Sequence, residues 1–135
     1  MSTPGRRLEE LPRDEAIELL SSVSMGRIGF TIGGLPTIRP VNHVVVDGDD
    51  IVIRTHLEST MSACSGAVVA YETDWLDRRT RTGWSVIVTG VASVVDNPWE
   101  IERFERLVQP WIDQPDTYLL RIKADVVEGL KLVAD

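Results

Sequence analysis

Hydrophobic and polar residues alternate along most of the chain, and a period of two residues is typical of β-strands with one buried face. Turn signals interrupt the alternation, first at Gly33-Gly34 and then at the acidic stretch "DGDD", residues 47–50. The pattern predicts about seven strands, arranged mostly as hairpins. These strands are expected at residues 25–32, 35–47, 50–55, 67–74, 83–95, 117–125 and 126–134.

Helical spacing is confined to short segments. Residues 13–22 place several apolar side chains near one helical face, a second helix is expected after a cap at Ser59, and Asn97 precedes a third from Trp99 to about Val108. Long helices that would alternate with the strands do not occur in the pattern. The predicted fold class is therefore mainly β, an antiparallel barrel with short helices rather than a doubly wound sheet.

The predicted strand at residues 83–95 is long for a small barrel. At about 3.3 Å per residue it would extend for roughly 40 Å if it were straight. We therefore expect the strand to bend, and Gly90 is the place where a missing side chain permits the bend.

Chain length and charge narrow the class of protein. A chain of 135 residues fits a single domain, residues 1–135, in which residues 1–12 are expected as a loose arm because they contain Pro4, Gly5 and Pro12. The net charge of −7 argues against binding to nucleic acid. No apolar run approaches the roughly 20 residues of a membrane span, so we expect a cytoplasmic protein that does not enter membranes.

Residues with metal or nucleophile chemistry are few. Cys64 is the single cysteine, which excludes an internal disulfide, and His43 and His56 are the two histidines, so no metal site is predicted. No local signature of a nucleophile surrounds Cys64, which is interpreted as a buried apolar filler. His43 stands in an apolar run, where a packed and hydrogen-bonded histidine is more common than a catalytic one.

Two arginines and several hydroxyl groups gather around one predicted hairpin. Arg39 and Arg54 lie on adjacent strands, and a guanidinium matches the geometry of a phosphate. Thr55, Ser59 and Thr60 add donors just beyond the second strand, at the start of a short helix. The alternative is that the arginines are solvated and the hydroxyls only cap the helix. From residue chemistry alone, the sequence indicates an antiparallel barrel with a candidate anion site.

The order of four short motifs carries more information than any one of them. "GRIGF", "IRPVN", "VIRT" and "GWSVIVTG" follow one another with a spacing that resembles the pyridoxamine 5'-phosphate oxidase-like family of FMN-binding split barrels, and in particular its small actinobacterial-type members. The resemblance runs from about Leu19 to Val95. It implies a six-stranded antiparallel split barrel, a homodimer, and two FMN sites at the dimer interface.

The resemblance also implies roles for particular residues. The second predicted strand would lie along the flavin, the third would end near its phosphate, the following helix would close over the phosphate, and the long strand would reach the cofactor from beside it. The implied cofactor-binding residues are Arg39, Pro40, Val41, Asn42, Arg54, Thr55, Ser59, Thr60, Trp84 and Ser85.

One departure from the family pattern concerns the phosphate. FMN-binding members commonly have Gly-Ser/Thr-Lys where this chain has Glu58-Ser59-Thr60. A lost lysine–phosphate contact would weaken binding by about 1.5–3 kcal/mol. The resemblance therefore leaves a deazaflavin coenzyme or haem open as alternatives to FMN.

Three functions remain open from the sequence. The first is an FMN-dependent oxidoreductase of unknown small-molecule substrate, in which no catalytic residue is assigned and His43 is the one candidate proton donor. The second is a non-catalytic barrel that binds or sequesters a cofactor, and the third is a degenerate dimeric barrel with an empty site. Trp99 and Trp111 are expected to anchor the dimer.

Overall fold

A computed structural model describes residues 5–134 and contains eight strands and three helices in that range. The strands are β1 (Arg6–Leu11), β2 (Met25–Ile32), β3 (Leu35–Val46), β4 (Asp50–Thr55), β5 (Val68–Asp77), β6 (Thr82–Val94), β7 (Tyr118–Ile122) and β8 (Val126–Ala134). The helices are α1 (Arg13–Ser21), α2 (Glu58–Cys64) and α3 (Pro98–Leu107).

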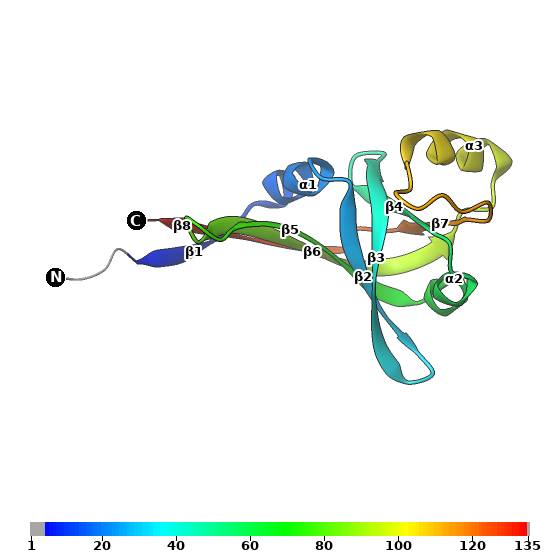
Figure 1. Cartoon of the computed structure of the whole chain (residues 1–135), viewed down its shortest axis with the longest axis horizontal. Coiled ribbons are helices and arrows are strands. Elements are labelled where there is room, and N and C mark those ends of the chain that lie inside the picture. The colour runs from blue at the N-terminus through cyan, green and yellow to red at the C-terminus, as the bar shows by residue number, and fades with distance from the viewer. Residues whose placement is uncertain (1–4, 135) are drawn as a thin grey trace.

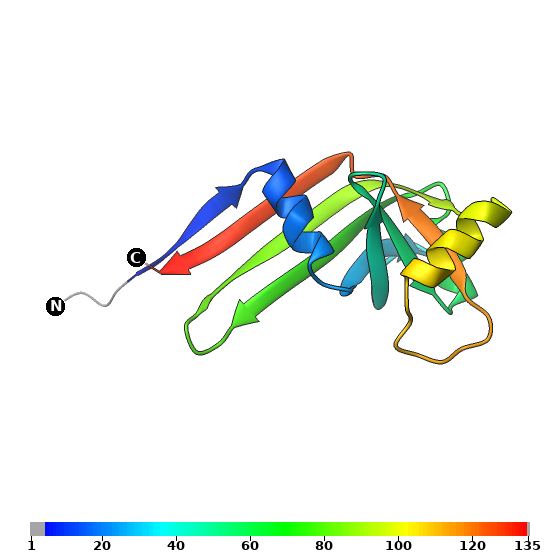
Figure 2. The ribbon, with the colours of Figure 1, turned by 90° about the horizontal axis from the view of Figure 1, so that it is seen from above.

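Six of the strands close into an antiparallel barrel. The sheet order is β1-β8-β6-β5-β2-β3-β4-β7, and a further pairing of β6 with β7 joins the barrel strands into a ring. Strands β8 and β1 continue the sheet beyond β6 as a long extension, with α1 packed against it (Figure 1, Figure 2). The predicted fold class and the six-stranded barrel are confirmed.

Strand β6 belongs to both the barrel and the extension. It pairs with β8 from Gly83 to Thr89 and with β7 from Ala92 to Val94. The change of partner falls at Gly90, where a Cβ atom would collide with the carbonyl oxygen of Lys123. The predicted importance of Gly90 therefore has a physical cause, which is the close approach of the chain that leaves β7.

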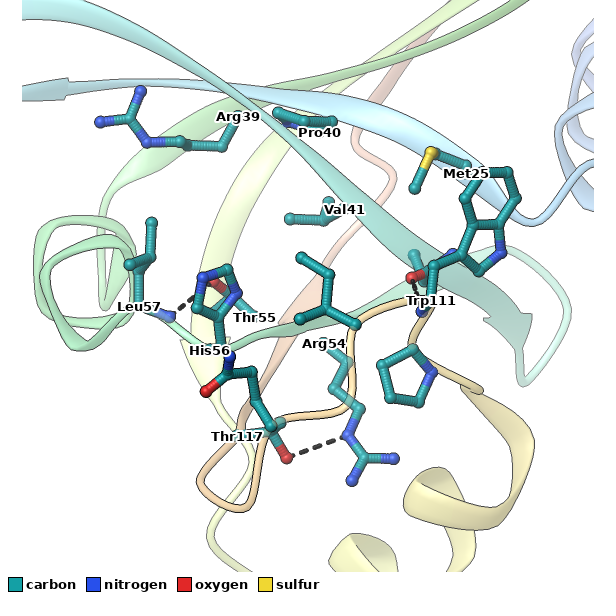
Figure 3. A pocket seen from close by; sticks show the side chains of 14 residues that line it. Met25, Arg39, Pro40, Val41, Arg54, Thr55, His56, Leu57, Trp111 and Thr117 are labelled. Carbon is teal, nitrogen blue, oxygen red and sulfur yellow. Dashed lines mark hydrogen bonds between the residues drawn. The ribbon is translucent and has the colours of Figure 1, made fainter.

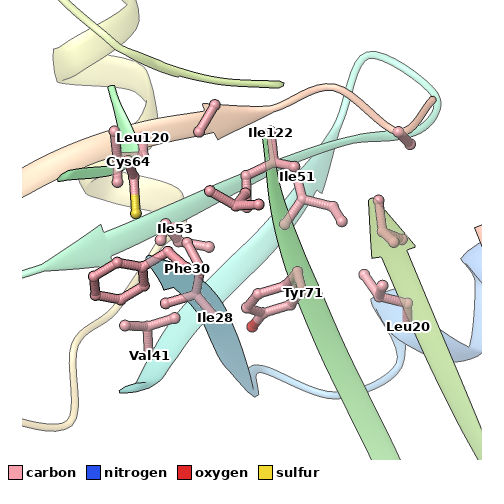
Figure 4. Packing of buried hydrophobic residues seen from close by; sticks show 14 of the residues in the cluster. Leu20, Ile28, Phe30, Val41, Ile51, Ile53, Cys64, Tyr71, Leu120 and Ile122 are labelled. Atoms are coloured by element: carbon pink, nitrogen blue, oxygen red, sulfur yellow. The ribbon is translucent and has the colours of Figure 1, made fainter. Parts of the chain in front are cut away.

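The core fills the barrel and continues under α3. Large apolar side chains that are fully enclosed, including Ile28, Ile53 and Tyr71, point into the barrel (Figure 4). A second cluster seats α3 on the outer side of β4 and β7 through Phe104 and Val108. The side chain of Asn97 caps α3 by accepting hydrogen bonds from two backbone N–H groups of its first turn.

Three expectations about elements are corrected. Residues 6–11 are not a loose arm but strand β1, paired along its whole length with β8, whereas residues 1–4 lie outside the described part of the chain. The predicted strand at 67–74 is longer at its end, because β5 continues to Asp77 and pairs with β6 there. Ser59 does not cap α2; it lies inside the helix, whose N-cap position is Leu57.

Among the helices in the described range, none is long and apolar enough to cross a membrane.

Candidate functional site

A pocket opens between strands β3 and β4 and the segment that follows α3. Its cavity volume is about 180 Å³, and the pocket is bounded by β3, the end of β4 and residues 110–117 (Figure 3). Its wall is formed by Met25, Arg39, Pro40, Val41, Asn42, Arg54, Thr55, His56, Leu57, Pro110, Trp111, Ile112, Gln114 and Thr117.

The pocket is cationic in an acidic protein. Among the described residues, Arg39 and Arg54 contribute to its wall and no aspartate or glutamate does, although the net charge of the chain is −7. Arg39 is exposed and uses one guanidinium nitrogen to donate a hydrogen bond to its neighbour's carbonyl, at 3.1 Å from Ile38 O. This charge pattern favours an anionic ligand and gives Arg39 free donors to bind it.

Arg54 is held by the protein itself. Its Nε donates to Thr117 Oγ1 at 2.9 Å, and its Nη1 donates to the carbonyl oxygens of Glu105 and Val108 at 3.2 and 3.1 Å. The last two acceptors lie at the C-terminal end of α3, where cationic groups are favoured. The guanidinium therefore ties the end of α3 to the start of β7 while it lines the pocket.

Residues 109–117 form a strap across one side of the pocket. Asn42 is buried under this strap and makes two hydrogen bonds: its Oδ1 accepts from the backbone N–H of Trp111 at 3.0 Å, and its Nδ2 donates to Ser24 O at 3.3 Å. Trp111 and Arg39 lie on opposite sides of the pocket in Figure 3. The pocket therefore has the indole ring of Trp111 on one side and the guanidinium of Arg39 on the other.

Six of the ten predicted site residues meet in this pocket, and they are Arg39, Pro40, Val41, Asn42, Arg54 and Thr55. The other four do not line it. Ser59 is exposed on α2, and the side chain of Thr60 points into the protein, where its hydroxyl has no hydrogen-bond partner. Trp84 and Ser85 lie on the part of β6 that pairs with β8, in the extension.

The sequence missed the side of the pocket formed by the strap. Trp111 was interpreted as an interface residue, and His56, Leu57, Ile112 and Thr117 were assigned no role. Two apolar residues between Pro110 and Pro115, in a segment with no strand or helix pattern, were the available signal.

His43 and Cys64 have structural surroundings. His43 is buried, its Nε2 lies 2.9 Å from Leu20 O, and its Nδ1 lies 2.5 Å from Tyr71 Oη. Because a carbonyl only accepts, Nε2 donates and Nδ1 accepts from the tyrosine hydroxyl. Burial lowers the pKa of the His43 imidazole and raises the pKa of the Tyr71 hydroxyl.

Burial also raises the pKa of the Cys64 thiol to about 11, so the thiolate needed of a nucleophile is disfavoured. The interpretations of His43 as a packed histidine and of Cys64 as a buried filler are confirmed.

Comparison with known proteins agrees with this fold. The sequence profile of the pyridoxamine 5'-phosphate oxidase family matches residues 12–132. Rv0080, an uncharacterized protein of Mycobacterium tuberculosis, is 48% identical over 137 residues that span 97% of this chain and 90% of that protein.

Two solved structures resemble this protein along nearly their whole length. One is a candidate pyridoxamine 5'-phosphate oxidase of Corynebacterium glutamicum, which is 30% identical over 93% of this chain and 98% of that chain, with a TM-score of 0.80. The other is an FAD-binding protein of Mycobacterium smegmatis, which is 31% identical over 90% of this chain and 95% of that chain, with a TM-score of 0.73. This chain, a split barrel with a cationic pocket beside β3, belongs to the pyridoxamine 5'-phosphate oxidase family.

Proposed function

We propose that this protein binds a flavin nucleotide, FMN in the first instance, and uses it as an oxidoreductase. The observation that carries the proposal is the polarity of the pocket, which has Arg39 at one end, Trp111 at the other and no carboxylate in its wall. A flavin nucleotide matches this arrangement, because it joins a phosphate to a flat aromatic ring system. The FAD-binding relative supports a flavin and leaves the choice between FMN and FAD to experiment.

The pocket suggests that a second copy of the chain completes the site. Its volume of about 180 Å³ is below the roughly 300–1,000 Å³ of pockets that enclose drug-sized ligands. An uncovered face of the sheet adjoins the pocket. Its residues follow from the strand register, because directly opposed residues in neighbouring strands share a face. One row on this face runs through Ile38, Gly29, Ala70, Thr89 and Val126.

The pocket and the uncovered sheet face meet at Pro40. Its neighbour two residues back, Ile38, is 67% exposed on the uncovered face, while Pro40 itself lines the pocket. A homodimer that buries this face would therefore bring the partner up to the edge of the cofactor site. This arrangement supports the two interface sites that the family resemblance implies.

The protein residues in the pocket bind and orient rather than react. Arg39 would hold the phosphate, while Val41 and Trp111 would keep water from the ring. When bound, the flavin supplies the hydride and electron chemistry. Haem is the second candidate, and His56 is the histidine in the described pocket wall that would bind its iron.

The absorption spectrum of the purified protein tests the proposal. We expect the paired near-ultraviolet and blue bands of a flavin, and the mass of the cofactor released on denaturation distinguishes FMN from FAD. A Soret band would favour haem and a single near-ultraviolet band a deazaflavin. If the protein is colourless and FMN added in excess does not bind, the proposed function is wrong.

Turnover separates an oxidoreductase from a carrier. We expect the bound flavin to be reduced by a nicotinamide cofactor or a small organic donor and to be reoxidised by a second substrate over repeated cycles. A protein that binds flavin tightly but keeps it fully oxidised with each donor supplied would support cofactor storage.

A further inference from the structure

The strap is held in place by hydrogen bonds to side chains and not by hydrogen bonds between backbone groups. Within residues 5–134, no backbone–backbone hydrogen bond involves residues 109–117. Instead, Asn42 accepts from the N–H of Trp111, and Arg54 binds Thr117 at one end of the strap and the carbonyl of Val108 just before the other. Two buried or half-buried residues of the pocket wall therefore determine where the strap lies.

The strap places large apolar side chains at the pocket without burying them. Trp111 and Ile112 both line the pocket, yet they are 70% and 52% exposed. In ordinary folding such side chains would pack into the core. Trp111 lies opposite Arg39, where a flat ring in the pocket would cover it (Figure 3).

We propose that the strap is the ring-binding wall of the site, with Trp111 and Ile112 as the residues that determine specificity for a flat aromatic ligand. The inference rests on the proposed function. Asn42 and Arg54 are then positioning residues, since they act on the ring through the strap. Arg39 at the other end recognises the phosphate and not the ring.

The experiment compares FMN, which has both the ring and the phosphate, with ligands that have only one of the two. The full-length protein is titrated with FMN, with riboflavin, which lacks the phosphate, and with inorganic phosphate as a competitor. The variants are Trp111→Ala, Ile112→Ala and Arg39→Ala, with Trp99→Ala as the matched control. Trp99 is 81% exposed on α3 and lies outside the pocket wall.

Trp111→Ala should weaken the binding of FMN and of riboflavin by the same factor, about three- to tenfold, which is the usual contribution of an aromatic contact to affinity. Competition by inorganic phosphate should not change, so the preference for FMN over phosphate falls. Arg39→Ala should weaken FMN but not riboflavin. Trp99→Ala should change neither, and Ile112→Ala should follow Trp111→Ala with a smaller factor.

Asn42 provides a second test of the strap. Asn42→Asp keeps an oxygen that accepts from the Trp111 amide, whereas Asn42→Leu does not, and both lose the bond to Ser24. Riboflavin affinity should fall further in the second variant than in the first, even if both lower the melting temperature.

The outcomes separate the two proposals. If the wild-type protein binds neither flavin, the proposed function is wrong. If it binds both flavins and Trp111→Ala behaves like Trp99→Ala, or if Asn42→Leu binds riboflavin as the wild type does, flavin binding stands and the strap is not its ring-binding wall.

Discussion

At the scale of single residues, the sequence located most of the pocket but not the role of each group. Arg39, Pro40, Val41 and Asn42 were found because they lie within one motif on one strand, β3. The hydrogen bonds of the Arg54 guanidinium could not be predicted from the sequence, because their acceptors lie 51–63 positions further along the chain. Hydrogen-bond partners that distant are set by the fold and leave no local pattern.

Replacing Arg54 should therefore cost stability even without cofactor. Arg54→Ala removes three hydrogen bonds, two to the C-terminal end of α3 and one to Thr117, the last residue of the strap. We expect the free energy of unfolding of the cofactor-free protein to fall by about 1–3 kcal/mol, with partial recovery in Arg54→Lys. Urea unfolding measures this, and Arg78→Ala, an exposed arginine in the β5–β6 turn, is the control. An unchanged midpoint would show that these bonds contribute nothing.

His43 should make stability depend on pH. Burial lowers its pKa in the folded protein below the ordinary 6.5, so between the two values the unfolded chain binds a proton that the folded chain does not. Stability contributed by the neutral imidazole is complete above pH about 7.5 and is lost as pH falls through 6.5 to the lowered pKa. Urea unfolding at pH 7.5, 6.0 and 5.0 should show this loss.

The control for that series is His43→Gln, which removes the titrating group and leaves every carboxylate in place. Its stability should be lower at pH 7.5 but should fall less between pH 7.5 and 5.0 than that of the wild type. Equal losses in the two proteins would assign the pH dependence to other groups.

At the scale of elements, the alternation of apolar and polar residues and the turn residues predicted the type and order of most strands and helices. The predicted strands at 25–32 and 50–55 agree with β2 and β4 to the residue, because each is bounded by a turn with positive-φ residues such as Gly34 and Gly48. Strand β1 was missed because "RRLEEL" has exposed charges on an edge strand and little alternation. Its strand conformation comes from pairing with β8, which is a contact across the whole chain.

Gly90 tests the crossing between barrel and extension. A Cβ atom at this position would collide with the backbone carbonyl of Lys123, so Gly90→Ala has to displace the connection between β7 and β8. We expect a loss of at least about 2 kcal/mol in the free energy of unfolding. Gly29→Ala is the matched control, since the nearest atoms to its Cβ lie 3.8 Å away or further. Similar melting temperatures for the two variants would contradict this account.

At the scale of the whole molecule, the barrel was predictable from the sequence and its uncovered sheet face was not. Family resemblance implied a dimer, and composition pointed to Trp99 and Trp111 as anchors. The structure adds a broader candidate, the uncovered sheet face on which Val68 and Val91 are directly opposed and Val126 is 60% exposed. Such a face is assembled from five strands, so no single stretch of sequence displays it.

The two candidate surfaces predict different effects of a single charge. We expect the sheet face to form the dimer, because it exposes the apolar side chains of Ile38, Val68 and Val126 and adjoins the pocket, whereas Trp99 stands on the outer helix α3. Val68→Glu places a charge on the face, directly opposite Val91, and should give a monomer by light scattering at micromolar concentration, because a buried unpaired charge costs several kcal/mol. Trp99→Glu should remain a dimer. Because the site would lose its second half, the Val68→Glu monomer should also bind FMN at least tenfold more weakly, while its circular dichroism stays that of the barrel. A dimeric Val68→Glu protein together with a monomeric Trp99→Glu protein would move the interface to α3, and a wild-type protein with the mass of one chain would exclude the dimer.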